Sequence, residues 1–397
     1  MQICICRVRV EYVKLEEICT IVSGGTPSRS KPNYWNNGNI PWIKIKDMKS
    51  KYIDSAEEFI TEEGLNNSST KMLKRDTLLY SIFATLGEVG ILKIDACTNQ
   101  AIAGLSLKED SNILKEYLYY YLKSKKKDVN NLGRGVAQNN INLSLLRKFK
   151  IPVIPLRQQK KIIEVLDNVS STINNYEREL ALLDELVKAR FVEMFGDPST
   201  NDMLWNTDVL KDICTKIGSG STPRGGKESY IDEGISLIRS MNVHNAYFEY
   251  KDLAHITLYQ AEKLNNVVVE RGDVLFNITG ASVARCCVVP SDVLPARVNQ
   301  HVCILRCREK INSIFLQGLL VNENYQGKLL QIAKSGATRE AINKQQLESL
   351  EIMLPPLELQ NQFASFVEEI DKSRSRIQKS LEASQELFDS LMQEYFG

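Results

Sequence analysis

The sequence predicts an α+β fold: two homologous globular domains joined by two long antiparallel coiled-coil helices, with a pseudo-two-fold relation between the halves. Three observations predict it. The 397-residue chain repeats itself once, each copy contains short apolar runs separated by turn residues, and each copy ends in a long heptad pattern. No run of roughly 18 or more apolar residues occurs, so a membrane span is not expected.

The repeat consists of matched motifs whose offset grows along the chain. Residues 15–20 match 210–215 at an offset of 195, and the loop 23–27 matches 219–223 at 196. From residues 141–142 onward the matches lie 201 apart, and residues 159–196 align with 360–397 without a gap. The remaining pairs are 40–44 with 235–239, 75–80 with 272–277 in register on the aspartate, Asn99-Gln100 with Asn299-Gln300, Ile141-Asn142 with Ile342-Asn343, Pro155-Leu156 with Pro356-Leu357, Gln159 with Gln360, and Phe195-Gly196 with Phe396-Gly397. A duplication whose loops have drifted explains this pattern.

Each copy is predicted to be a globular domain followed by one helix. Runs of Ile, Val, Leu and Tyr between Gly, Pro, Asn and Asp indicate strands and turns, with helical patches near residues 113–127 and 314–333. Prolines at 155, 355 and 356 end a strand and begin each long helix. The predicted domains are 1–157 and 206–357, and the predicted spacer helices are 158–205 and 358–397.

The two predicted long helices carry a heptad seam. A helix of about 38 residues is about 57 Å long at about 1.5 Å per residue, so its apolar stripe needs a long partner. A solvent-exposed linker would not need this pattern, and we expect the two helices to pair antiparallel. The seam residues are Leu166, Val169, Ile173, Tyr176, Leu180 and Leu183 in the first helix, and Val367, Ile370, Ile377, Leu381 and Phe388 in the second, where Arg374 and Ser384 also fall on it.

Charge is unevenly distributed although the chain as a whole has a net charge of +1. Residues 1–157 contain 24 Lys and Arg against 16 Asp and Glu, a net charge of +8. The two helical parts each have a net charge of −4, and residues 206–357 have +1. This distribution is compatible with a protein that contacts DNA through some segments and other proteins through the rest.

Cysteine and histidine patterns give no indication of a metal site. The nine cysteines include no CxxC pairs, so buried reduced thiols are expected, and the three histidines form no ligand pattern. Arg7, Arg9 and Glu11 interrupt the apolar start too early for a signal peptide, which makes a cytoplasmic protein the expectation.

Several short motifs recur in a fixed order over the whole chain. They are the opening at 15–20, the Ser-Gly-Gly-Thr-Pro loop at 23–27, the Ile-Pro-Trp-Ile-Lys strand at 40–44, Asn-Asn-Ile-Asn at 139–142, Pro-Leu-Arg-Gln-Gln at 155–159, and a duplicated helix that ends in Phe-Gly. In this order, and repeated, they resemble the specificity subunits of Type I restriction-modification systems. The second copy departs from the pattern at Ser236 and Leu359, where the first has Pro41 and Gln158.

The resemblance implies two target-recognition domains, each reading one half of a bipartite DNA sequence. It also implies spacer helices that dock two adenine methyltransferase subunits, which use S-adenosylmethionine, and restriction subunits that join them. The chain itself would bind no cofactor and catalyse nothing. It has neither the Asp/Asn-Pro-Pro-Tyr/Phe motif and glycine-rich loop of such a methyltransferase nor a phosphate-binding Gly-x-x-x-x-Gly-Lys-Ser/Thr loop.

Polar loops that contain glycine are the expected DNA contacts, because their backbone can approach phosphates and their Arg, Lys, Asn and Gln side chains can read base edges. The candidates are Ser28, Arg29, Ser30, Lys31, Arg134, Gln138, Asn139 and Asn140 in the first domain, and Arg224, Lys227, Asn277, Thr279, Ser282, Lys334, Ser335, Thr338 and Arg339 in the second. Two alternatives stay open: the Ser-Gly-Gly-Thr-Pro loop is only a turn, or the protein is a coiled-coil scaffold without DNA readout.

Overall fold

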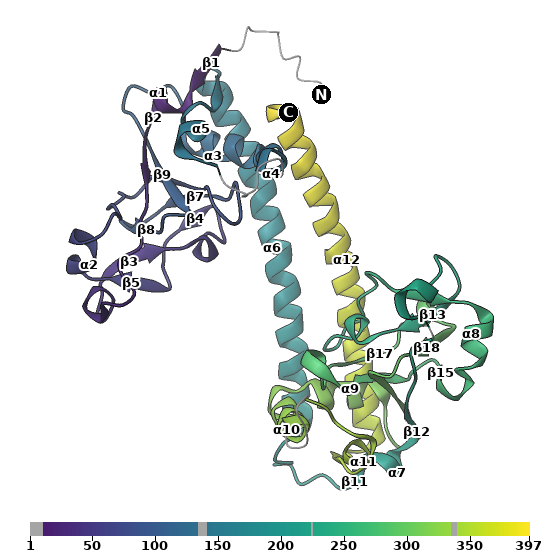
Figure 1. Ribbon diagram of the computed structural model, residues 1–397. Coiled ribbons are helices and arrows are strands. Elements are labelled where there is room, and N and C mark those ends of the chain that lie inside the picture. The colour runs from purple at the N-terminus through teal and green to yellow at the C-terminus, as the bar shows by residue number, and fades with distance from the viewer. Residues whose placement is uncertain (1–10, 134–140, 224, 335–339) are drawn as a thin grey trace. The chain divides into compact units, whose positions relative to one another are not determined.

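A computed structural model describes residues 11–133, 141–223, 225–334 and 340–397, and it divides into two compact units. Unit 1 comprises Met1–Asn175 with Ser380–Gly397, and unit 2 comprises Tyr176–Lys379. The long helices α6 (Leu156–Phe195) and α12 (Leu357–Phe396) each contribute to both units (Figure 1).

Unit 1 contains two sheets and a two-stranded ribbon. The larger sheet has the strand order β2-β9-β6-β7-β4, the smaller has β5-β3-β8, and β1 pairs with β10. The strands are β1 (Glu11–Lys14), β2 (Cys19–Ser23), β3 (Ile40–Ile43), β4 (Tyr52–Ile53), β5 (Glu58–Ile60), β6 (Leu78–Ser81), β7 (Val89–Leu92), β8 (Cys97–Thr98), β9 (Ile102–Leu107) and β10 (Lys150–Val153). The short helices are α1 (Leu15–Ile18), α2 (Glu62–Asn66), α3 (Lys115–Ser124), α4 (Lys126–Gly133) and α5 (Leu143–Arg147).

Unit 2 repeats this arrangement apart from one edge strand in each sheet, since among the described strands β4 has no counterpart in unit 2 and β15 has none in unit 1. Its sheets have the orders β12-β19-β16-β17 and β14-β13-β18-β15, and β11 pairs with β20. The strands are β11 (Thr207–Val209), β12 (Cys214–Ser219), β13 (Ile235–Ile238), β14 (Ala254–Ile256), β15 (Val268–Val269), β16 (Val274–Asn277), β17 (Cys286–Val288), β18 (Ala296–Val298), β19 (Val302–Cys307) and β20 (Glu351–Met353). The helices are α7 (Leu210–Ile213), α8 (Leu258–Glu262), α9 (Ser313–Val321), α10 (Glu323–Lys334) and α11 (Lys344–Glu348).

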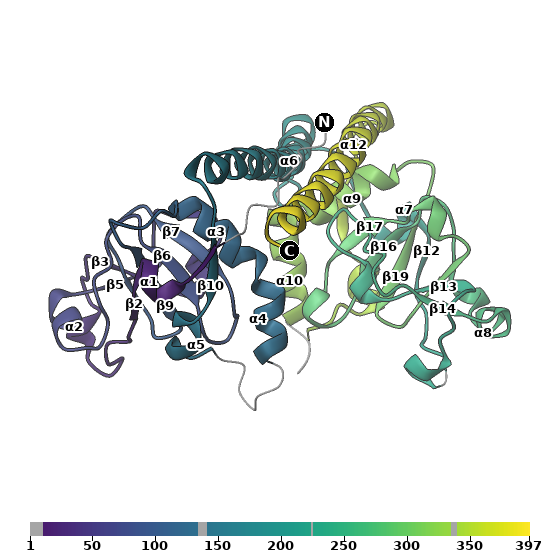
Figure 2. The same ribbon diagram turned by 90° about the horizontal axis from the view of Figure 1, so that it is seen from above.

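The prediction of a duplicated α+β fold is therefore confirmed. Helix α3 lies against β7 in unit 1, as α9 lies against β16 and β17 in unit 2 (Figure 2). The Ile-Asn motif has the same task in both copies: Ile141 and Ile342 are buried, while Asn142 and Asn343 cap the helices α5 and α11.

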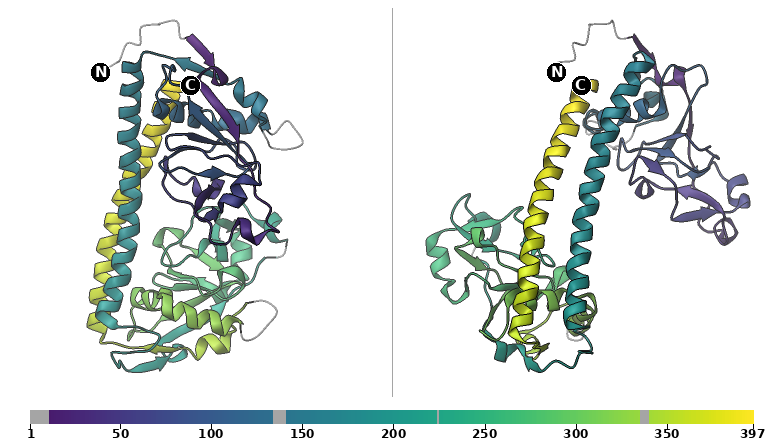
Figure 3. Two further views of the ribbon diagram at one scale, coloured as in Figure 1. Left: turned by 90° about the vertical axis from the view of Figure 1, so that its left-hand side faces the viewer. Right: turned by 180° about the vertical axis from the view of Figure 1, so that it is seen from behind.

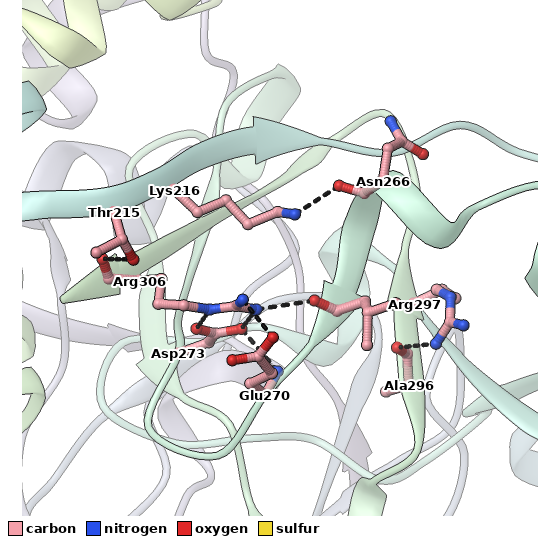
Figure 4. A network of polar contacts seen from close by, with 9 residues as sticks. Thr215, Lys216, Asn266, Glu270, Asp273, Ala296, Arg297 and Arg306 are labelled. Atoms are coloured by element: carbon pink, nitrogen blue, oxygen red, sulfur yellow. Dashed lines mark hydrogen bonds and ion pairs between the residues drawn. The ribbon is translucent and has the colours of Figure 1, made fainter.

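A β-bulge accounts for the first change in the repeat offset. In unit 1, β2 pairs with β9 without interruption from Cys19 to Ser23. In unit 2 the pairing of β12 with β19 shifts between Cys214 and Lys216, so Thr215 is the additional residue. The hydroxyl of Thr215 donates a hydrogen bond to the carbonyl oxygen of Arg306 on the neighbouring strand (Figure 4). The offset therefore grows from 195 to 196 at this residue.

The alignment of residues 75–80 with 272–277 on the aspartate is wrong by one residue. Leu78 pairs with Leu105 in unit 1, and Val274 pairs with Leu305 in unit 2, so the strands correspond at an offset of 196. The turn before each strand agrees, because the residues with positive φ are Asp76 (70°) and Gly272 (83°). Glycine and aspartate both tolerate that conformation, and sequence similarity alone had favoured matching the two aspartates.

The corrected register shows that unit 2 has an ion pair at the positions where unit 1 has two hydroxyl groups. Thr77 and Ser106 lie 3.2 Å apart through their hydroxyl oxygens in unit 1. The corresponding positions in unit 2 are Asp273 and Arg306, whose bidentate ion pair has N–O distances of 2.8 and 2.9 Å (Figure 4). Asp273 is fully buried, and its hydrogen bonds raise the pKa of Arg306 above its ordinary value. This ion pair ties β16 to β19.

Helices α6 and α12 pack antiparallel within each unit (Figure 3). In unit 1, Leu166 near the start of α6 shares a hydrophobic cluster with Met392 and Phe396 at the end of α12. In unit 2 the roles reverse, since the ring centroid of Phe195 at the end of α6 lies 5.6 Å from that of Phe363 near the start of α12. Each Phe-Gly end of the repeat thus packs into the core at the start of the other long helix, which explains why the motif is duplicated.

The heptad seam occupies the least exposed face of both helices. Every predicted seam residue is buried or half-buried, whereas most residues between them are exposed. Arg374 on the seam forms an ion pair with Asp184 of α6. Ser384 donates a hydrogen bond to the carbonyl oxygen of Ser380, one turn earlier, at 2.8 Å. Both polar seam residues therefore have partners, which allows them to occupy an otherwise apolar stripe.

Six of the seven described cysteines are buried and all seven are free thiols, while Cys4 and Cys6 lie outside the described residues. Within the described ranges, no group of three His, Cys, Asp or Glu residues could hold a metal ion. In that same part of the chain, no helix has the length and apolar character that crossing a membrane requires.

Candidate nucleic-acid interface

Two repeated motifs meet at the same place in each unit and form a clasp. Thr26 donates a hydrogen bond to the side-chain carbonyl oxygen of Gln100 in unit 1, and Thr222 does the same to Gln300 in unit 2. The Gly-x-Thr-Pro loop therefore has a structural role as well as an exposed position. The loop backbone at Gly220 also lies close to the backbone of Val298. A Cβ atom on Gly220 would lie 1.8 Å from the carbonyl oxygen of Val298, so only glycine fits there.

Beside the clasp of unit 2 lies a polar cleft of about 470 Å³. It is formed where β16 turns into β17, between the end of β13 and the start of β19. Its lining includes six hydrogen-bonding or basic side chains together with Gly280 and Ala281. The lining residues are Ser240, Met241, His244, Thr279, Gly280, Ala281, Ser282, Arg285 and His301.

A hydrogen-bond relay connects the clasp to the cleft. The amide nitrogen of Gln300 lies 3.2 Å from Nε2 of His301, whose Nδ1 lies 2.5 Å from the hydroxyl oxygen of Thr279. Because Thr222 already donates to the Gln300 oxygen, the amide nitrogen faces His301 as a donor. Nε2 of His301 then accepts from Gln300, and Nδ1–H donates to the hydroxyl oxygen of Thr279.

Arg285 supplies positive charge that no described carboxylate neutralises. Its guanidinium lies 3.4 Å from Nδ1 of His244, and the imidazole stacks on Tyr247 with ring centroids 4.6 Å apart. Among the described residues Arg285 has no ion pair. A half-buried guanidinium beside hydroxyl donors is suited to phosphate oxygens or to the acceptor edge of guanine.

The first unit carries different side chains at the same positions. The amide of Ser81 bonds to the carbonyl oxygen of Glu88, as that of Asn277 bonds to Arg285, so Glu88 corresponds to Arg285. Ala101 corresponds to His301 in the same way, through its carbonyl oxygen. Glu88 pairs with Lys126 at 2.5 Å. The two units therefore share a scaffold and differ in the surface that it presents.

In unit 1 the exposed feature beside the clasp is a cation held on two indole rings. The Arg29 guanidinium lies 3.6 Å from the ring centroid of Trp35 and 5.1 Å from that of Trp42. The indole nitrogens in turn fix the loop, since Trp35 donates to the carbonyl oxygen of Ser28 and Trp42 donates to that of Gly25. The loop around Arg29 is consequently preorganised.

Glu58 neutralises this cation. Its carboxylate pairs with Arg29 at 2.5 Å and with Lys44. Partial burial raises the pKa of Glu58, but the hydrogen bonds and charges of Lys44 and Arg29 outweigh it, and the net pKa lies below the ordinary glutamate value. Arg29 and Lys44 therefore share one carboxylate.

Comparison with known proteins decides the family. The family model described as "Type I restriction modification DNA specificity domain" matches residues 7–184 and 203–385, once for each repeat. The chain belongs to this family. As a specificity subunit it determines the DNA target of a Type I restriction-modification system and has no catalytic role of its own. The alternative of a scaffold without DNA readout is thereby removed.

Two similar proteins are both specificity subunits, and they differ in how much of each chain the match covers. The EcoR124I/EcoR124II specificity subunit of Escherichia coli is 34% identical over 188 residues, and that match spans 46% of each chain. The match therefore covers about half the length of that relative. The MjaIX specificity subunit of Methanocaldococcus jannaschii is 24% identical over 401 residues, which span 96% of this chain and 90% of that one.

Solved structures show the same fold. The specificity subunit of a Type I system from M. genitalium superposes with a TM-score of 0.60 at 13% identity and covers 100% of this chain and 98% of its own. A second solved structure, which describes the complex assembly and conformational transition of a type I restriction-modification system, gives a TM-score of 0.57 at 17% identity and covers 98% and 97%.

The predicted contact residues of the specificity subunit fall into three groups. Ser28, Arg29, Ser30 and Lys31 lie together on the exposed loop beside the indole rings, where Lys31 donates a hydrogen bond to the Tyr34 hydroxyl at 2.9 Å. Thr279 and Ser282 line the cleft, and Lys334 is exposed at the end of α10. The residues that lie outside the described part are Arg134, Gln138, Asn139, Asn140, Arg224, Ser335, Thr338, Arg339 and the side chain of Lys227.

Asn277 was chosen with the cleft residues, but the structure gives it a different place. Its side chain is fully buried and donates to the carbonyl oxygens of Ser240 and Val243 at 2.9 and 3.3 Å. Asparagine here supports the loop that carries Ser240 and does not reach the surface. We leave Asn277 out of the interface for this reason.

Sequence reasoning provided no basis for choosing Arg285, His244 or His301. They are far apart in the chain, and only the folding of β13, β16, β17 and β19 brings them together. One signal was present in the sequence, because Gln300 belongs to a repeated Asn-Gln pair and His301 follows directly after it. The repeated Asn-Gln pair supports the same loop in both units, and the residue that follows it differs between them and faces the cleft in unit 2.

Proposed function

We propose that this specificity subunit reads a bipartite and asymmetric DNA target, with one half-site contacted by each globular unit. The observation that carries the proposal is the pairing of a common scaffold with unlike surfaces. The clasp and the order of the four strands β2-β9-β6-β7 are repeated in unit 2 as β12-β19-β16-β17, whereas Arg285 and His301 stand where the first unit has Glu88 and Ala101. A reader of two identical half-sites would be expected to repeat these side chains as well.

The proposed contacts are the cleft in unit 2 and the stacked Arg29 loop in unit 1. Arg285 would contact a phosphate or a guanine edge, and Thr279 and Ser282 would add hydrogen bonds. The residues predicted within 134–140, 224–227 and 334–339 remain proposed contacts on sequence grounds. Glu340 supports the last of these, because its carbonyl oxygen accepts a hydrogen bond from Gly280 of the cleft at 2.9 Å.

We also propose that the paired helices set the gap between half-sites and hold two methyltransferase subunits, with restriction subunits joining the assembly. Exposed apolar residues on α6 support a docking role, since Leu182 and Leu186 are 56% and 46% exposed. Leu186 lines a shallow hollow with Arg190 and Phe366 of the same unit. S-adenosylmethionine would be bound by the methyltransferase partner, and the assembly would act in the cytoplasm.

The test is to reconstitute the subunit with its methyltransferase and map methylated adenines across a random-sequence DNA library. We expect one motif made of two unlike half-sites separated by unread bases. A contiguous motif, or two identical half-sites, would contradict the proposal.

Arg285→Ala in the same assay assigns one half-site to unit 2. Loss of one good contact of this kind costs about 1–3 kcal/mol, or roughly 5- to 150-fold in methylation rate, and it should relax one half-site only. Arg271→Ala is the matched control, because Arg271 is exposed before the opposite end of β16. Equal effects of both variants, or relaxation of both half-sites, would remove Arg285 from the interface.

A further inference from the structure

The first turn of each long helix contains a glutamine whose side chain is completely buried. Gln159 and Gln360 are both 0% exposed, and both lie in the first turn of a helix that is otherwise open to solvent on several sides. Glutamine is rarely buried unless its amide has partners, since an unsatisfied polar group in the interior costs about 1–3 kcal/mol. A repeated buried glutamine therefore requires a physical explanation.

The Gln159 amide joins three backbone groups from two segments of unit 1. Its oxygen accepts a hydrogen bond from the amide of Leu114 at 2.8 Å. Its nitrogen donates to the carbonyl oxygens of Asn112 at 2.7 Å and Ile154 at 2.8 Å. Asn112 and Leu114 precede α3, and Ile154 follows β10. The start of α6 is thus bonded to the segment before α3 and to a residue that joins β10 to the helix.

Gln360 makes the same set of bonds in unit 2. Its oxygen accepts from the amide of Asn312 at 2.9 Å, and its nitrogen donates to the carbonyl oxygens of Pro355 at 2.8 Å and Lys310 at 3.4 Å. Asn312 and Lys310 precede α9, the helix that corresponds to α3. The same joint has therefore been retained in both copies, although the neighbouring residues differ.

Hydrogen bonds of this kind restrict the helix in a way that apolar packing does not. A leucine at the same site would fill the space, but it would still let the helix rotate or slide by small amounts against the domain. Three directional bonds to two segments fix the rotation of the helix about its own axis. The joint thereby defines the angle at which each domain leaves its helix.

We propose that Gln159 and Gln360 are positioning residues that set the gap between the two half-sites by fixing each reading domain on its spacer helix. The proposal rests on the bipartite reading proposed above. One added base pair moves a half-site by about 3.4 Å along the duplex and about 35° around it, so small rotations at either joint change which gap fits. Neither glutamine contacts DNA in this scheme.

The experiment uses the complete methyltransferase complex and the random-sequence library described above. The variants are Gln159→Met and Gln360→Met, which keep the side-chain length and remove the three bonds. We expect the same half-site bases with a broader distribution of gap lengths, and the ratio of methylation at gaps one base pair longer or shorter to that at the wild-type gap should rise about tenfold. Gln158→Met is the matched control: its side chain is exposed, and we expect its gap ratio to be unchanged.

The outcomes distinguish a role of the glutamines in setting the gap from a general role in stabilising the fold. A uniform loss of methylation at every gap length would mean that the glutamines only stabilise the fold and would overturn the proposal, as would an unchanged gap ratio in folded complexes. If the methionine variants fail to assemble, Gln159→Asn and Gln360→Asn keep the amide but shorten its reach, and the same ratio decides. A wild-type motif without a gap would instead contradict the bipartite function itself.

Discussion

At the scale of single residues, the proposed contacts of the two units differ in whether a carboxylate neutralises the cation. Arg29 stacks on Trp35 and pairs with Glu58, which also pairs with Lys44. Arg285 has no such carboxylate among the described residues. We therefore expect unit 1 to bind DNA by exchanging one anion for another, and unit 2 to present a cation that is already available.

Glu58→Gln tests this exchange. Removal of the carboxylate frees two cations for phosphates, so affinity for non-specific duplex DNA should rise roughly two- to tenfold at low salt, with a steeper salt dependence. Filter binding or fluorescence anisotropy at several salt concentrations measures it. Glu62→Gln removes the same charge at an exposed site with no ion pair among the described residues and should leave the affinity unchanged.

The same variant has a defined pH dependence. Because the pKa of Glu58 is lowered in the native state, its ion pairs stabilise the protein above the ordinary glutamate pKa, and that stability is lost as pH falls through the lowered value. The difference in unfolding temperature between wild type and Glu58→Gln should therefore be largest near neutral pH and vanish in acid. A difference that persists at low pH would mean that Glu58 stabilises the loop by packing.

At the scale of elements, the sequence predicted most of the fold because repetition reveals itself in residue spacing. Heptad spacing identified the face of each long helix that is least exposed, and Phe-Gly marked where both helices end. The alignment of the two copies was wrong at the turn before β6 and β16, because backbone conformation matters more there than side-chain identity. There the positive φ of Asp76 corresponds to that of Gly272, and the aspartate of unit 2 is the next residue.

The candidate site was less accessible to sequence reasoning. Loops with glycine and arginine were found, but the cleft depends on which residues four non-consecutive strands bring together. Asn277 illustrates the error, since a polar residue at a strand end can face inward and support a neighbouring loop. Without the direction of its side chain, the sequence does not distinguish support from contact.

The clasp loop yields a prediction about packing. Gly220 has no room for a methyl group, because a Cβ atom would lie 1.8 Å from the carbonyl oxygen of Val298 and backbone would have to move. Gly220→Ala should lower the free energy of unfolding by about 1–3 kcal/mol or more. Gly218→Ala, two residues earlier in β12, is the control, since its Cβ atom would meet nothing within 4 Å. Denaturant titration compares the two, and equal effects would show that the loop yields freely.

At the scale of the whole molecule, the two units share their long helices. Leu166 and Phe195 both belong to α6, but the first lies in the core of unit 1 and the second in that of unit 2. The same holds for Phe396 and Phe363 on α12. Loss of either unit therefore removes packing partners from helices on which the other depends. Because both cores use the same two helices, we expect the chain to unfold as one cooperative system.

The buried thiols make this cooperativity measurable. Burial raises the pKa of Cys97 to about 11, and burial, opposed by Lys108, raises that of Cys19 to about 12 in unit 1. Cys303 of unit 2 likewise has a pKa of about 12 because of burial. At pH 8 a thiol of pKa 11 is ionised in about one molecule in a thousand, so native thiols should react very slowly with alkylating agents. Above pH 9 the unfolded thiols ionise first, and stability should fall as pH rises.

Alkylation in increasing denaturant at pH 8, followed by peptide mass spectrometry, tests the prediction for each unit separately. Cys4 and Cys6 are first replaced by serine, because they lie outside the described residues. We expect Cys19 and Cys97 of unit 1 to become reactive at the same denaturant concentration as Cys214 and Cys303 of unit 2. The shared helices require this coincidence. Two separate transitions would mean that each unit retains its half of α6 and α12 when the other unfolds, and the helices would then be a connection between independent domains.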